Sequence, residues 1–155
     1  MQEASLRKYA LVAEIVSAVA VVVSLIFVAL QIKDNTDAVR AATYDDILSD
    51  HIQWRMTIAS SPALNETMVK DFTDSAPLTP TEEQTRSWVA QAAWQIYERA
   101  YFARKYQTLG DSEWERYEAA ICRTFLNRDF ETELAPYLTA EFAEYARGCA
   151  KNTDR

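Results

Sequence analysis

The 23 residues from Ala10 to Ile32 contain one charged side chain, that of Glu14. A helix rises about 1.5 Å per residue, so about 20 apolar residues cross the hydrocarbon core of a bilayer, which is about 30 Å thick. The apolar core of a secretory signal is shorter, about 7–15 residues, and leads to a small-residue cleavage site. We therefore predict that this stretch is an uncleaved transmembrane helix.

The rest of the chain suits a single helical domain. The 155 residues include two Gly and four Pro, which disfavours a many-turned β protein and suits long helices. We predict that residues 1–33 form an N-terminal tail and the transmembrane helix, and that residues 34–155 form an acidic helical domain. The predicted fold is all-α: the transmembrane helix continues into a soluble bundle of about five helices.

Local signals mark where these helices start and stop. No Pro or Gly occurs in residues 34–60, so the spanning helix is expected to continue to about Ser60. Ser61 can cap a short helix to about residue 72, with Pro62 at its first position.

A capping box of Thr79 and Glu82 is expected to open a long central helix, which runs to about Leu109 and stops at a left-handed Gly110. Two further helices are predicted at about 112–128 and, capped by Thr139, at about 140–147 before Gly148.

The central helix is apolar on two faces, so we expect it to be covered on both. The first face contains Trp88, Val89, Ala92, Ile96, Ala100 and Ala103. The second contains Trp94, Tyr97 and Tyr101.

The charge distribution bears on partners and on orientation. Residues 34–155 hold 21 of the 23 acidic and 13 of the 16 basic residues, a formal balance of −8. Nucleic acid binding needs excess Lys and Arg, so we expect no nucleic acid partner. Arg7 and Lys8 before the span match Lys33 and Arg40 after it, so the basic residues that govern orientation leave the side of the domain undecided.

Small residues recur along the span at spacings of 3, 4, 3 and 4. They are Ala10, Ala13, Ser17, Ala20 and Ser24, and we call them the small-residue seam. In lipid, helices associate through close van der Waals contact, which small side chains permit. Glu14 lies at the edge of this seam. It either hydrogen-bonds a neighbouring helix or reaches the headgroup region.

Four polar side chains fall on predicted apolar faces: His51, Arg55, Arg99 and Glu118. Buried charges are normally paired, so we expect Glu118 to meet Arg55 or Arg99. The cluster is interpreted either as a buried ion pair that fixes helix register or as a pocket for a carboxylate or other anion, which Arg binds in bidentate geometry.

The sequence shows no catalytic or metal-binding motif, and we predict no catalytic residue, metal or cofactor. Its single His excludes paired Glu-x-x-His ligation, and neither a phosphate loop nor G-x-S-x-G nor H-E-x-x-H occurs. Cys122 and Cys149 fit no zinc or C-x-x-C spacing. They are expected to pair if the domain is extracytoplasmic and to be buried thiols if it is cytoplasmic.

The run "EIVSAVAVVVSLIFVALQIKDNTDAVRAATYDDI", with an acidic residue opening the span and Asn-Thr shortly after it, resembles a group of small uncharacterised bacterial proteins. The likeness is strongest over residues 14–47 and looser over the aromatic-rich remainder. It implies a single-pass protein of the bacterial inner membrane with a helical domain, and it transfers no catalytic residues.

We therefore expect a non-enzymatic, membrane-anchored assembly or accessory subunit. Through its transmembrane helix it would associate with itself or with a larger membrane complex. The alternative is a membrane-tethered binding or sensing module for a small anionic or amphipathic ligand.

Overall fold

The structure is a computed structural model that describes residues 2–73, 75–125 and 130–153. Within these ranges it contains six α-helices, one 3-10 helix and no strand, so the all-α prediction is confirmed. The elements are α1 (Gln2–Ser60), α2 (Pro62–Thr73), α3 (Pro80–Lys105), α4 (Asp111–Phe125), α5 (Phe130–Glu133), η1 (Ala135–Tyr137) and α6 (Ala140–Thr153).

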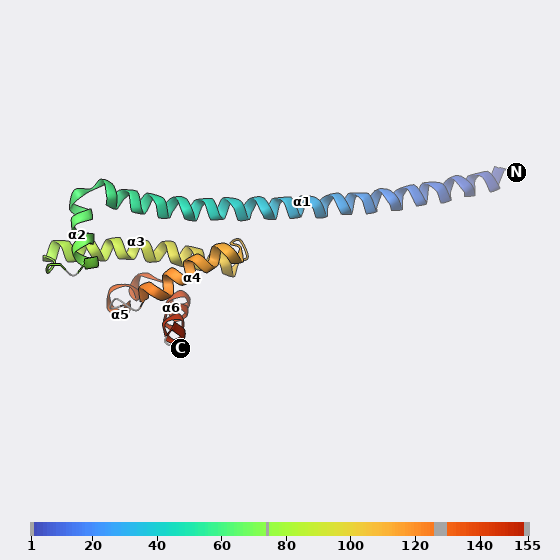
Figure 1. The fold of residues 1–155 in the computed structure, drawn as a ribbon. Coiled ribbons are helices and arrows are strands. Elements are labelled where there is room, and N and C mark those ends of the chain that lie inside the picture. Colours follow the sequence, from blue (N-terminus) through green and yellow to red (C-terminus); the bar gives the residue numbers. More distant parts are fainter. Residues whose placement is uncertain (1, 74, 126–129, 154–155) are drawn as a thin grey trace. The chain divides into compact units, whose positions relative to one another are not determined.

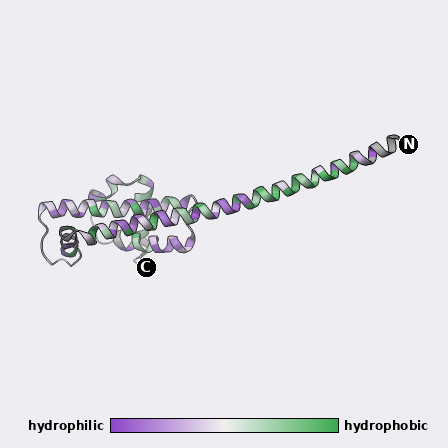
Figure 2. Cartoon of the chain, turned by 90° about the horizontal axis from the view of Figure 1, so that it is seen from above, coloured by the Kyte–Doolittle hydropathy of each residue, from purple (hydrophilic) through white to green (hydrophobic). Residues whose placement is uncertain are grey.

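The chain divides into two compact units, Met1–Val39 and Arg40–Arg155. In the first, the large apolar side chains from Leu11 to Ile32 are 47–64% exposed, and Figure 2 shows them as the green run of α1. A helix that is apolar on all sides is typical of a membrane span or of a buried core helix. No residue of its most apolar stretch is buried. Among the described residues, α1 is the one helix long and apolar enough to cross a membrane.

In the second unit, α3 lies between the C-terminal part of α1 and the α4–α6 pair (Figure 1). Trp94 on α3 is 1% exposed, and its ring contacts Phe130 of α5 and Phe142 of α6 at centroid distances of 5.1 and 6.0 Å. The rest of the core comes chiefly from α3, α4 and α6, and it includes Tyr97, Ala100, Ala103, Tyr117, Ile121 and Ala146. Burial of these side chains is the main force that holds the helices together.

The beginnings of α2 and α3 follow the sequence signals. The amide of Leu64 donates to Ser61 Oγ at 3.4 Å. At α3, the amide of Glu82 donates to Thr79 Oγ1 at 3.3 Å, and the amide of Thr79 donates to Glu82 Oε2 at 2.8 Å. The predicted capping box is therefore present, and it satisfies amides that the first helical turn leaves without partners.

The end of α3 differs from the prediction. The helix stops at Lys105, and the left-handed residue is Gln107, with φ 61°, rather than Gly110. The amides of Thr108 and Gln107 donate to the carbonyls of Ala103 and Arg104 at 2.8 and 3.0 Å. This is a Schellman pair of hydrogen bonds. It closes the helix four residues early and places Leu109 in the core, where it is 2% exposed.

The C-terminal helix is longer than predicted. Thr139 caps α6 as expected, since the Phe142 amide donates to its Oγ1 at 3.4 Å. The helix nevertheless passes through Gly148, whose φ is not positive, and ends at Thr153. The predicted end of the preceding helix at Arg128 lies outside the described residues.

Candidate functional site

The first candidate surface is the small-residue seam of α1. The described side chains at its positions 13, 17, 20 and 24 are exposed, as is Glu14 at its edge; the side chain of Ala10 lies outside the description. Because the described apolar side chains of this unit are exposed, the four described seam positions are accessible to a neighbouring helix or to lipid.

The second candidate surface is a groove of about 620 Å³ between α1 and α3. One wall follows α1 at the helical spacing 50, 53, 54, 57 and 58. The other follows α3 at 85, 88, 89, 92, 95, 96 and 99, and Leu64 of α2 also contributes. We call it the α1/α3 groove.

Two tryptophans dominate the lining of the α1/α3 groove. Trp54 is half-buried, and its Nε1–H donates to the carbonyl of Val89 across the groove at 3.0 Å. Trp88 is 62% exposed. The hydrogen bond holds the Trp54 ring in one orientation along the side of the groove. Trp88, in contrast, presents a large apolar surface to solvent.

The prediction that both faces of the central helix, α3, are covered is therefore correct for only one of them. Its second face, with Trp94 and Tyr97, is buried. On the first face Ala100 and Ala103 are buried, but Trp88, Val89, Ala92 and Ile96 line the groove. Of the four residues predicted for a pocket, Arg99 lines this groove. Sequence reasoning did not predict the groove itself, because a wheel shows that a face is apolar and not whether another helix covers it.

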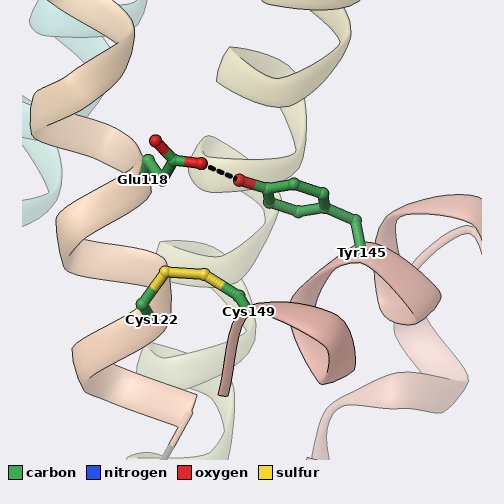
Figure 3. Close-up of a disulfide and its surroundings, with 4 residues drawn as sticks. All are labelled: Glu118, Cys122, Tyr145 and Cys149. Carbon is green, nitrogen blue, oxygen red and sulfur yellow. Dashed lines mark hydrogen bonds between the residues drawn. A yellow bond between two sulfur atoms is a disulfide. The ribbon is translucent and has the colours of Figure 1, made fainter. Parts of the chain in front are cut away.

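The four predicted polar residues do not form one cluster. Arg99 is about half exposed and pairs with two carboxylates of α1, Asp50 and Asp46, the latter at 3.2 Å from Nη2. Glu118 is half-buried and accepts a hydrogen bond from the Tyr145 hydroxyl at 2.6 Å (Figure 3). The expected pairing of Glu118 with an arginine is corrected: Glu118 lies on α4 facing α6, whereas Arg99 lies on α3 facing α1.

Arg55 is exposed, and His51 sits one turn before it at the edge of the core. The His51 ring lies 6.1 Å from the ring of Tyr97 and 6.4 Å from that of Tyr117, centroid to centroid. Burial, with a smaller contribution from the Arg55 charge, lowers the pKa of His51 below its ordinary value. The ring contacts therefore place His51 in the aromatic packing, whereas Arg55 is exposed.

Both cysteines of the chain form a disulfide that joins α4 to α6 (Figure 3). The Cα atoms of Cys122 and Cys149 are 5.3 Å apart, within the usual disulfide range of about 4.4–6.8 Å. Of the two alternatives left open by the sequence, the structure adopts the paired one.

Within the described residues, no group of three or more His, Cys, Asp or Glu side chains is placed to hold a metal ion. Comparison of the chain with protein-family models, with curated proteins and with solved structures gave no match.

Proposed function

We propose that this protein is a non-enzymatic, membrane-anchored subunit that associates through its transmembrane helix with itself or with a larger membrane complex. The observation that carries the proposal is the exposed apolar surface of α1 from Leu11 to Ile32. A tether needs only length and hydropathy, whereas this span also carries the small-residue seam. Such a seam permits the close backbone approach on which helix association in lipid depends.

We further propose that the helical domain lies on the oxidising side of the inner membrane. The supporting observation is the bond between Cys122 and Cys149. Disulfides persist in extracytoplasmic compartments and are rare in the reducing cytosol. The basic residues around the span are balanced and do not oppose this orientation.

Cysteine cross-linking in native membranes tests the association. Ser17→Cys and Ser24→Cys place thiols on the seam, and Val22→Cys places one on the opposite side of the same helix. We expect cross-linked species at the two seam positions and none at Val22. Equal trapping at all three positions, or trapping at none, would contradict a role for the seam.

A second candidate function is that of a membrane-tethered binding module. The observation that favours it is the α1/α3 groove with its exposed Trp88. An exposed apolar surface around a large aromatic side chain is typical of a binding site. Its test is the ligand titration described below.

A further inference from the structure

We propose that the α1/α3 groove binds a small amphiphile with one positive charge, its apolar body between Trp54 and Trp88 and its cationic group beside Asp50 and Asp46. This inference rests on the second candidate function and names the class of ligand for that site.

The size and walls of the groove fit a small molecule. Its volume of about 620 Å³ falls within the range of about 300–1,000 Å³ that is common for ligand sites. The lining is mainly apolar, with Ile58, Leu64, Val89, Ala92 and Ile96 beside the two indoles. Because the Trp54 indole is already held by Val89, part of the site is formed before any ligand arrives.

The charge at one end of the groove selects a cation. Asp50 and Arg99 are the charged residues of the lining, and Asp46 also pairs with Arg99. Two carboxylates surround one guanidinium, so this end carries a residual charge of −1. An anion must displace a carboxylate from Arg99, whereas a cation meets the uncompensated negative charge without breaking a pair.

The aromatic walls favour the same sign of charge. The face of an indole carries negative electrostatic potential and attracts a cation within about 6 Å of the ring. The remaining polar side chains of the lining, which include Gln53, Thr57, Thr85 and Gln95, are neutral. They offer hydrogen bonds but do not offset the preference for a cation.

Three matched probes test the charge preference: 3-phenylpropyltrimethylammonium, neutral 3-phenylpropanol and the anion 3-phenylpropanoate. Each is titrated into the full chain in nanodiscs of zwitterionic lipid, with empty nanodiscs as the blank. The readout is tryptophan emission, since all four Trp residues lie in the C-terminal unit. We expect saturable binding of the cation, and binding of the anion at least about tenfold weaker.

Three variants locate the site. Trp88→Ala should abolish saturable binding while the helical circular dichroism is kept. Asp50→Asn should weaken cation binding about tenfold and leave binding of the neutral probe unchanged. Asp45→Asn removes an exposed carboxylate of α1 that does not line the groove, and it should leave all three affinities unchanged.

The outcomes separate this inference from the function beneath it. If the anion binds as tightly as the cation and Trp88→Ala abolishes both, the groove is a binding site and the proposed ligand class is wrong. If no probe saturates above the empty-nanodisc blank, both the ligand class and the binding function fall. If Asp45→Asn and Asp50→Asn weaken cation binding equally, the attraction comes from the overall negative charge of the domain. The proposed position of the cationic group beside Asp50 is then wrong. None of these results bears on association through the span.

Discussion

The two units of this chain are both helical, but the apolar side chains of the first are exposed and many of those of the second are buried. In Met1–Val39, large apolar residues such as Leu25, at 64% exposed, lie on the surface of the unit. In Arg40–Arg155, Trp94, Ile121 and Phe142 are at most 1% exposed. The first unit depends on its surroundings for a partner, whereas the second builds its own core. Substitutions of similar chemistry should therefore have different effects in the two units.

The largest expected effect is that of Trp94→Ala in the core of the second unit. Truncation of a buried Trp leaves a cavity and typically costs about 3–5 kcal/mol of unfolding free energy. Denaturant titration followed by tryptophan emission measures it. Trp88→Ala is the matched control on the same helix: its side chain is 62% exposed, so its cost should be much smaller. In the first unit, Phe27→Ala should leave the transition unchanged, and equal losses at residues 27 and 94 would contradict the comparison.

The disulfide should give the next largest effect. The bond closes a loop with a sequence separation of 27 residues. In the chain-entropy description, this loop raises the free energy of the unfolded state by about 3.5 kcal/mol. The double variant Cys122→Ser and Cys149→Ser should lower the unfolding free energy by about that amount. Added reductant should reproduce the loss in the parent and change nothing in the double variant. A parent that reductant leaves unaffected would show that the bond does not form.

The capping box of α3 should contribute less. Thr79→Ala removes the acceptor of the Glu82 amide, and loss of such a cap costs about 1 kcal/mol. Thr81→Ala, two residues along at an exposed position, serves as the control. The same denaturant titration compares the two variants, and an equal effect would show that the cap is not formed.

The smallest expected effect is a dependence on acid. Hydrogen bonds from Lys70, and then from Thr79, lower the pKa of Glu82 to about 2 from its ordinary 4.5. As the pH falls, Glu82 is therefore protonated at a higher pH in the unfolded chain than in the folded one. The stabilisation is full above pH 4.5 and is lost between pH 4.5 and about 2. Thermal melts across this range should show a shallower acid loss for Glu82→Gln, whereas Glu83→Gln, which alters an exposed neighbour, should behave like the parent.

Local signals predicted the helix beginnings and the ends of α1 and α2 well, and the ends of α3 and α6 poorly. The Ser61 and Thr79 caps depend on residues within three positions of each other, so the sequence contains all that is needed to predict them. The stop at Gln107 replaces the expected one at Gly110. Burial of Leu109 accompanies the earlier stop, and a local pattern does not reveal which residue the core will take.

The candidate sites show the same limit. Apolar and polar residues were placed on the correct helices, but the partners of Arg99 and Glu118 depend on which helices pack together. The α1/α3 groove is likewise a property of the packing between two helices. Pairing of Cys122 with Cys149 was left open, because it depends on how α4 and α6 meet.

The central claim is that residues 10–32 lie in the membrane and that the folded unit lies on its oxidising side. A site for a specific protease, inserted after Ala76 between α2 and α3, tests both parts in one experiment on intact spheroplasts. We expect protease added from outside to cut the chain, and the N-terminal fragment to stay in carbonate-washed membranes. Cleavage only after lysis would contradict the orientation, and release of the fragment by carbonate would contradict the span.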